Sequence, residues 1–330
     1  AWCMPKHNQY RPFVPDPKQI ALRPDITGNE INGLGETEPR PARMVYWAPD
    51  PDDIPHGAMQ RFFYSVNPDD PAIARHRAAR QKVLDARLPD ISSVRNERDP
   101  DSWTAELDKF GADGICEMSG MAKIDPDWVF EGHEVKFSRV IVLGFQHDYD
   151  EISTAPEPRA GGEVVLQYMR AAAGAKAVAG WLRKQGWDAE PVTGPMTGSL
   201  ALIPAALACG FGELGKNGSI LNPEMGSSFR LAAVLTDAPF APTTARDFGI
   251  DAFCQNCRVC EDACPPEALS PEKQTVRGVE KWYVDFDKCL PFFNQHHGCA
   301  ICIAVCPWSR PGVGLNLAAK LARRAERLAG

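Results

Sequence analysis

The pattern of apolar and polar residues divides the chain into an irregular first third, a regular middle and a cysteine-rich end. Residues 138–145, SRVIVLGF, are a short apolar run rich in β-branched residues, which predicts a buried strand. Residues 161–186 have a helical composition that closes with Lys184 and a C-capping Gly186. Residues 229–240, FRLAAVLTDAPF, predict a strand followed by a turn. Strands and helices therefore alternate in the middle of the chain, as in an α/β or α+β layered core.

These patterns predict four parts. They are an N-terminal wrapping arm over 1–102 with one helix around 71–88, a core over 103–247, a cysteine-rich module over 248–310 and a C-terminal amphipathic helix over 311–330. We expect the last helix to pack on the body of the protein.

Composition narrows the possible partners and location. The chain has 330 residues, 44% of them hydrophobic, and a net charge of -7, which argues against nucleic acid or an anionic membrane as the main partner. No segment reaches the roughly 18 consecutive apolar residues of a membrane span. The first residues show no apolar signal segment, so we expect a cytoplasmic protein. The alternative is an exported mature form whose signal has already been removed.

The chain has eleven cysteines, and their placement is informative. Eight lie between 254 and 306, whereas Cys3, Cys116 and Cys209 are scattered. A disulfide framework would be spread more evenly over a small secreted domain, so two short runs indicate metal ligation. We expect the three scattered cysteines to be small buried or bystander side chains.

The first run follows the bacterial-ferredoxin pattern for iron–sulfur clusters. It reads Cys254-x2-Cys257-x2-Cys260-x3-Cys264-Pro265. In this pattern the first three cysteines ligate one four-iron cluster, and the fourth ligates the other cluster when two are present. Zinc ribbons use paired Cys-x2-Cys units instead. The run therefore predicts iron–sulfur ligation.

The second run lacks its leading cysteine. It reads Cys299-x2-Cys302-x3-Cys306 followed by proline, and histidine stands at position 296. Thiolate is the usual ligand of a four-iron cluster, which favours the more distant Cys289 over His296. We predict two sets of ligands: cluster A with Cys254, Cys257, Cys260 and Cys306, and cluster B with Cys264, Cys289, Cys299 and Cys302.

A glycine-rich stretch matches a nucleotide-binding motif only by spacing. Gly210, Gly212 and Gly215 fit G-x-G-x-x-G, but no strand precedes them and no helical pattern follows. We do not expect a nicotinamide or flavin site here. The glycines still indicate sharp turns or close approach of the backbone.

Several segments, in order, resemble the cobalamin-dependent reductive dehalogenases, a family related to epoxyqueuosine reductase. They are SRVIVLGF, the helix with Tyr168, residues 208–240, the first cluster run, and DKCLPFFNQHHGCAICIAVCPW. The resemblance covers about 105–310 and implies a nitroreductase-like, corrinoid-binding α/β core with a C-terminal two-cluster bacterial-ferredoxin-like module. The family's second run has the same isolated distant cysteine, which supports Cys289. No Asp-x-His-x-x-Gly surrounds any histidine, in agreement with the base-off cobalamin that the resemblance implies.

The resemblance also implies a reaction and its residues. Electrons from a low-potential donor (ferredoxin, flavodoxin or a reductase) would pass through two [4Fe-4S] clusters to cobalamin, and halide would leave a small organohalide. Tyr168 would donate the proton, and the Arg230 cation would stabilise the phenolate left behind. The implied cofactor-binding positions are Thr193, Gly194, Thr197, Gly198, Phe211, Gly212, Glu213, Gly215 and Lys216, with Phe292 and Phe293 as aromatic walls of the substrate pocket.

Two other functions remain open from the sequence. One is an epoxyqueuosine reductase-like enzyme of tRNA modification, a family whose proton donor is an aspartate. The other is a non-catalytic corrinoid and iron–sulfur electron carrier. The tyrosine at 168 and the acidic charge of the chain favour the dehalogenase.

Overall fold

The computed structural model describes residues 9–67, 70–194 and 198–329. At its centre lies a four-stranded antiparallel sheet in the order β1–β2–β6–β3. The strands are β1 (Met118–Lys123), β2 (Arg139–Gln146), β6 (Phe229–Thr236) and β3 (Ala189–Val192). β2 and β6 confirm the two predicted strands, while the edge strands β1 and β3 were not predicted.

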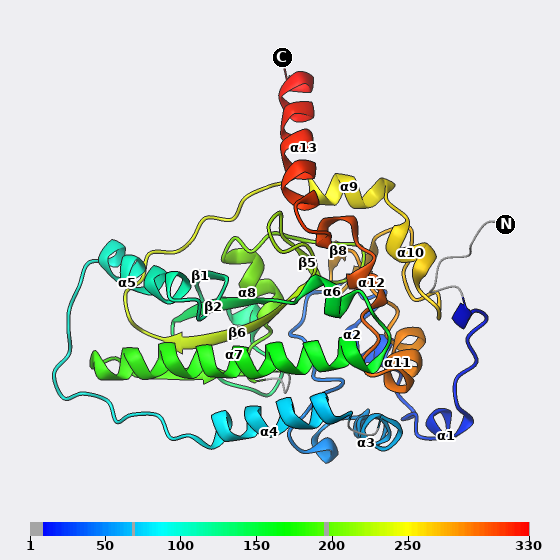
Figure 1. The fold of residues 1–330 in the computed structure, drawn as a ribbon, viewed down its shortest axis with the longest axis horizontal. Coiled ribbons are helices and arrows are strands. Elements are labelled where there is room, and N and C mark those ends of the chain that lie inside the picture. The colour runs from blue at the N-terminus through cyan, green and yellow to red at the C-terminus, as the bar shows by residue number, and fades with distance from the viewer. Residues whose placement is uncertain (1–8, 68–69, 195–197, 330) are drawn as a thin grey trace.

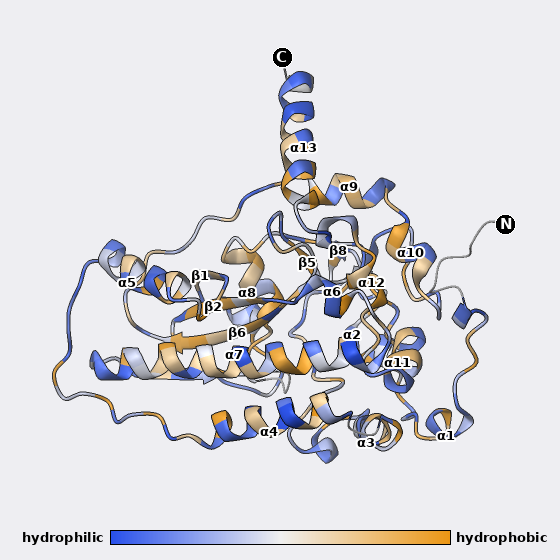
Figure 2. Cartoon of the chain, viewed as in Figure 1, coloured by the Kyte–Doolittle hydropathy of each residue, from blue (hydrophilic) through white to orange (hydrophobic). Residues whose placement is uncertain are grey.

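Helices cover both faces of the sheet, as Figure 1 shows. The long α7 (Pro158–Lys184) lies across one face, and the short α8 (Leu202–Ala208) packs on the other. Side chains of β2 alternate between these layers: Leu143 packs with the α7 side and Val142 with the α8 side, both fully buried. The strands are accordingly among the most apolar parts of the chain (Figure 2). The predicted mixed α/β core is confirmed.

Helix α7 confirms the helix predicted over 161–186. It is followed by Gly186, whose φ of +83° suits glycine at a helix end. Near its middle, a Cβ at Gly174 would lie 2.7 Å from the Phe145 ring, so glycine lets the helix approach β2 closely. Helix α5 (Pro100–Ala112) extends the same core with Trp103, which is fully buried.

The N-terminal arm contains more helix than the sequence predicted. The predicted helix around 71–88 is confirmed as α4 (Pro71–Asp85), which packs along α7. The arm also holds α1 (Pro17–Ile20), α2 (Gly28–Asn32), the 3-10 helix η2 (Pro51–Asp53) and α3 (Gly57–Val66). Most of these helices are too short for apolar periodicity to reveal them, and α2 depends on a capping box between Thr27 and Glu30.

Short elements build the rest of the chain. Around the core lie η3 (Pro126–Trp128), α6 (Tyr149–Ile152), β4 (Glu213–Leu214) and β5 (Ile220–Leu221). The cysteine-rich module contains α9 (Ile250–Asn256), α10 (Val259–Ala263), β7 (Gln274–Val276), β8 (Val279–Lys281), α11 (Phe286–Gln295), α12 (Ile301–Ala304) and η4 (Pro307–Ser309). In Figure 1 this module lies at the end of α7 where the arm begins.

The C-terminal helix α13 (Val313–Ala329) only partly matches its prediction. Leu317 and Leu321 pack against the apolar cluster under α9, but the following turns stand away from the body in Figure 1. Among the described residues, no helix combines the length and the hydropathy that crossing a membrane would require.

A buried polar network fastens the arm to α11. Asn294 is fully buried; its Oδ1 accepts a hydrogen bond from the Tyr46 hydroxyl at 2.7 Å, and its Nδ2 donates to Gln19 Oε1 at 3.0 Å. Asn67 Nδ2 donates to the Asn294 carbonyl. Three segments of the arm therefore meet at one residue of the helix that carries Cys289.

We expect Asn294→Ala to destabilise the protein, because it leaves the buried Tyr46 and Gln19 groups without this partner. Each buried polar group left unpaired costs roughly 1–3 kcal/mol. The measurement is the urea midpoint of unfolding. The control is Asn316→Ala, because Asn316 is exposed and its amide donates to the Gly312 carbonyl just before α13. Equal midpoints for the two variants would contradict a stabilising role for this network.

Candidate functional site

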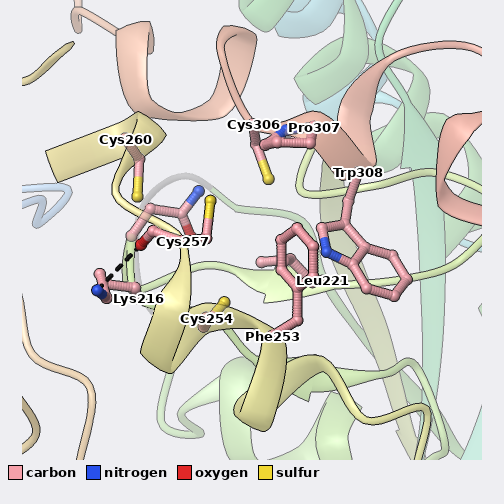
Figure 3. Close-up of a pocket in the computed structure, with 10 residues that line it drawn as sticks. Lys216, Leu221, Phe253, Cys254, Cys257, Cys260, Cys306, Pro307 and Trp308 are labelled. Carbon is pink, nitrogen blue, oxygen red and sulfur yellow. Dashed lines mark hydrogen bonds between the residues drawn. The ribbon is translucent and has the colours of Figure 1, made fainter. Parts of the chain in front are cut away.

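Four cysteines from both runs surround one cavity, shown in Figure 3. Cys254 lies in α9, Cys257 directly follows that helix, Cys260 lies in α10, and Cys306 precedes η4. Their sulfurs face the cavity, whose remaining wall includes Trp308 and other apolar side chains. These are the four residues predicted for cluster A, and the structure brings them together.

The donor set fits a four-iron cluster. Burial, with smaller contributions from the nearby Cys306 and Cys257, raises the pKa of the Cys254 thiol to about 11. Buried thiolates therefore need a compensating positive charge, which iron would supply. The sulfurs line a cavity, and no three His, Cys, Asp or Glu side chains within the described ranges are arranged to hold a single metal ion.

The other four cysteines form a second group. Burial raises the pKa of Cys289 to about 12, and Cys264 is its strongest charged neighbour. The pKa of Cys302 is raised by burial and then by Cys289 and Cys264, and Cys299 is affected by the same neighbours. Cys264, Cys289 and Cys302 also share one apolar cluster. The structure therefore brings together the set predicted for cluster B.

His296 is engaged elsewhere. Its ring stacks on Phe292 with centroids 3.9 Å apart and an angle of 13°, and its Nδ1 lies 3.0 Å from the Phe292 carbonyl oxygen. Tyr10 and Phe13 contact the ring edge-on. These contacts occupy the imidazole in an aromatic cluster and support the choice of Cys289.

The glycine-rich segment is a tight hairpin. Gly212 has a φ of +133°, and a Cβ there would lie 1.9 Å from the Leu221 carbonyl oxygen. A Cβ at Gly215 would lie 2.1 Å from a Leu221 methyl group. Strands β4 and β5 pair across this turn. The close approach expected from these glycines is therefore approach of the chain to itself.

Three side chains of this segment, each predicted to contact the corrinoid, have partners within the protein. Phe211 is fully buried in the core beneath the sheet. Lys216 lines the cavity of cluster A. The Glu213 carboxylate accepts hydrogen bonds from the backbone N–H groups of residues 248, 250 and 251 at 2.6–3.2 Å. The segment therefore shapes the core and holds the start of α9, the helix that carries Cys254, and its contact with a corrinoid stays a prediction.

A second group of predicted residues gathers at one end of the sheet. The guanidinium carbon of Arg230, on β6, lies 5.3 Å from the centre of the Tyr168 ring on α7. Gly194, after β3, adjoins the same ring, because a Cβ there would lie 3.5 Å from Tyr168 Cε1. Thr193, directly before Gly194, and Gly198 are both half-buried. Thr197 lies outside the described residues.

Two residues near Tyr168 were missed by sequence reasoning. Arg80, on α4 of the arm, donates a hydrogen bond to the Gly194 carbonyl and interacts electrostatically with Tyr168. His147 is buried, with Nδ1 3.1 Å from Ser228 Oγ. Burial, and then the Arg230 cation, lowers the pKa of His147 well below its ordinary value, so its ring is neutral. No sequence motif marks either residue.

Buried nitrogen atoms without partners occur in the residues near Tyr168 and Arg230. Within the described part of the chain, the Nε atoms of Arg80 and Arg230 and the Nε2 atom of His147 are buried and have no hydrogen-bond partner. Such atoms are rare in stable proteins and mark places where a ligand can bind. The arrangement can hold a polar or anionic group next to a tyrosine hydroxyl.

The predicted aromatic pair divides between two environments. Phe292 is buried with His296, whereas Phe293 lines a cavity of about 370 Å³ between the arm and α11. Tyr46 and Trp47 of the arm form the facing wall, and Cys289 lies at its side. Only Phe293 is therefore placed to meet a ligand in that cavity.

The scattered cysteines behave as predicted where they are described. Cys116 and Cys209 are buried, and burial raises their thiol pKa values to about 11 and about 12. Cys3 lies outside the described residues.

Comparison by sequence identifies relatives. Residues 253–309 match the family model described as a 4Fe-4S dicluster domain. The chain is 36% identical over 219 residues to a tetrachloroethene reductive dehalogenase of Desulfitobacterium hafniense, covering 62% of this chain and 39% of that protein. The enzyme of the same description from Sulfurospirillum multivorans is 28% identical over 186 residues, 54% and 36% of the two chains. An epoxyqueuosine reductase of Leadbetterella byssophila is 31% identical over 121 residues, 32% and 35%. The chain thus spans about two fifths of the dehalogenases that it matches.

Comparison by structure indicates a shared fold. The catabolic reductive dehalogenase NpRdhA in complex with 3-bromo-4-hydroxybenzoic acid superposes with a TM-score of 0.72 at 21% identity, covering 87% of this chain and 44% of that one. A second reductive dehalogenase structure gives a TM-score of 0.64 at 23% identity, covering 80% and 39%. The resemblance noted in the sequence is confirmed.

We expect Glu213→Gln to loosen the start of α9. The amide keeps one acceptor oxygen but loses the charge that three backbone N–H groups share, at a cost of about 1–2 kcal/mol. Hydrogen exchange of the peptide 247–256 should accelerate. Glu224→Gln, at an exposed site, is the matched control. Unchanged exchange in the Glu213 variant would remove this capping role.

Proposed function

On the premise that this chain is related to the reductive dehalogenases, we propose that it removes halide reductively from a small organohalide. The reaction adds two electrons and one proton to a carbon–halogen bond and yields a carbon–hydrogen bond and free halide. The observation that carries the proposal is the pair of Tyr168 and Arg230 at 5.3 Å, beside buried donors without partners. An acid is thereby placed next to a cation and to unsatisfied binding groups.

The electron path begins in the two cysteine sets. We infer that each holds one [4Fe-4S] cluster, in line with the dicluster family that residues 253–309 match. The two electrons of the reaction would then arrive one at a time from a low-potential donor such as a ferredoxin, a flavodoxin or a reductase. The exchange of Cys264 and Cys306 between the runs keeps the two sites close together.

We propose that a corrinoid in base-off form binds between cluster B and Tyr168. The cavity of about 370 Å³ is aromatic, has Cys289 in its wall, and is bounded by Tyr46. Tyr64 links it to the Tyr168 site, because Tyr64 interacts electrostatically with both Tyr46 and Arg80. The unpaired donors near Tyr168 suit a cofactor bordered by amide groups. Such a cofactor would supply the cobalt centre that reduces the carbon–halogen bond.

The proton chemistry rests on residues of this chain. Tyr168 donates its hydroxyl proton to the substrate carbon, which leaves a phenolate. The Arg230 cation lies against the ring and favours that phenolate. Arg80 brings a second guanidinium from the arm, and no carboxylate among the described residues forms an ion pair with it. The two cations therefore stay available to the phenolate and to the departing halide.

The alternatives differ at the same position. An epoxyqueuosine reductase-like enzyme would place an aspartate as donor where this chain has Tyr168. An electron carrier would contain the same cofactors and release no halide. Halide release by the cofactor-loaded chain therefore separates the three functions.

The ligand choice at cluster B gives one prediction. Wild-type protein prepared without oxygen should contain about eight iron atoms and about one cobalt per chain. Cys289→Ala should lose or convert cluster B, with a lower iron count and a changed EPR signal, because it removes a thiolate. His296→Ala should keep the full iron count, because its imidazole is held by Phe292. The reverse result would make His296 the ligand.

The proton donor gives another. Tyr168→Phe should keep its iron and cobalt but lose turnover by about a hundredfold to ten-thousandfold, the usual contribution of a positioned general acid. Arg230→Leu should lose less, because the hydroxyl remains. The two losses should not add, because both residues serve one transfer. The assay is halide release under a strong reductant, over aryl and alkyl halides.

If Tyr168→Phe with its full cofactor content turns over at nearly the wild-type rate, Tyr168 is a packing residue of the core and not the proton donor. Arg170→Leu is the control for general damage to α7, since Arg170 lies on the same helix and pairs with Glu117.

A further inference from the structure

Lys216 is a buried cation at the cavity of cluster A. Its side chain is 2% exposed. Its Nζ donates a hydrogen bond to the Cys257 carbonyl oxygen at 3.0 Å, as Figure 3 shows, and lies 3.4 Å from Glu261 Oε2. It also lies 5.1 Å from the centre of the Trp282 ring. The ammonium group is therefore held between two residues of the loop that carries the cluster A cysteines.

The backbone around Lys216 is fixed. Lys216 follows Gly215 in the tight turn between β4 and β5, and Glu213 ties this turn to α9. The backbone N–H of Lys216 itself donates a hydrogen bond to the Cys254 sulfur. The long side chain cannot easily leave the cavity, because Trp282 and the Cys257 carbonyl enclose it.

The four charged side chains beside the cavity sum to zero, but they are buried to very different degrees. Glu261 is 12% exposed and is the carboxylate that pairs with Lys216. The same carboxylate also pairs with Arg258 at 3.1 Å, and that arginine is 67% exposed and shares a second carboxylate, Asp262. The most deeply buried of these four charges is therefore the ammonium group of Lys216. In a site with little water, such a charge acts on the cluster with little screening.

We propose that Lys216 raises the reduction potential of cluster A. Reduction adds one electron, and hence one negative charge, to the cluster and its four thiolates. A fixed ammonium group stabilises that added charge more than it stabilises the oxidised cluster. The proposal rests on the proposed function only in requiring an iron–sulfur cluster at these four cysteines. It also explains why a lysine stands in the glycine-rich turn, where its side chain serves cluster A.

The test is an EPR-monitored redox titration of the iron-loaded full chain, with dithionite as the source of electrons. Lys216→Gln should lower the midpoint potential of one cluster and leave the other unchanged. At a fixed potential, the ratio of reduced to oxidised cluster should fall about tenfold, which is about 59 mV for a one-electron couple. Lys216→Arg keeps the charge, so its midpoint potential should stay close to the wild-type value.

Lys273→Gln is the matched control. Lys273 Nζ lies 5.7 Å from the centre of the same Trp282 ring, but it pairs with Asp251 at 2.8 Å and is more exposed. Its loss should leave both potentials unchanged. Glu261→Gln removes the opposing charge and should raise the potential of the same cluster. This variant tests the proposal by sign even if Lys216→Gln fails to bind iron.

Iron-replete Lys216→Gln with both midpoints at their wild-type values would overturn the proposal, as would an unshifted Glu261→Gln. Wild-type protein that binds no cluster would instead refute the proposed function. If the protein holds both clusters but releases no halide, the proposed function fails, and the effect of Lys216 on the midpoint potential can still be measured.

Discussion

The exchange of cysteines between the two runs is the constraint on which the rest of the structure depends. Neither run completes a set of four by itself, because Cys264 joins the second run and Cys306 joins the first. Helices α9 and α10 must therefore pack against the segment from Cys289 to Cys306 for both sets to form. The hairpin of β4 and β5 then closes one side, and the arm closes the other through its hydrogen bonds to Asn294. Cofactor site and tertiary fold are in this sense one assembly.

The Tyr168 site is assembled in a different manner. Its residues come from α7, β6, the loop after β3 and α4, which meet where the arm crosses the end of the sheet. Register between the strands fixes part of it, since Arg230 pairs with Phe145 across β2 and β6. The remainder depends on α4 packing along α7, because Arg80 reaches Gly194 from there. The strand and helix positions of Arg230 and Tyr168 direct their side chains toward each other, and the packing of the arm adds Arg80 to the same site.

Prediction from the sequence succeeded where a short local pattern has one direct structural cause. The runs of cysteine, the continuous apolar run of β2 and the glycine after α7 each predicted what the structure shows. It was less successful with short helices of the arm, which depend on caps and on tertiary contacts. The role of Gly212 and Gly215 toward a cofactor stays a prediction, because close approach to a ligand and close approach to Leu221 require the same residue. Arg80 and His147 were out of reach, since a lone arginine or histidine carries no pattern.

The cavity of about 370 Å³ has walls of two origins. The side near Cys289 belongs to α11 and cannot change much without disturbing the cysteine sets. The facing side, residues 43–47, belongs to the arm and contributes no cysteine. Apart from Tyr46, whose hydroxyl donates a hydrogen bond to Asn294, residues of this short stretch can therefore be substituted to alter the shape and polarity of the cavity while the cysteines and this hydrogen bond are kept. In evolution or in directed selection, this strip of the arm is where new ligand preferences can arise at the least risk to the cysteine sets.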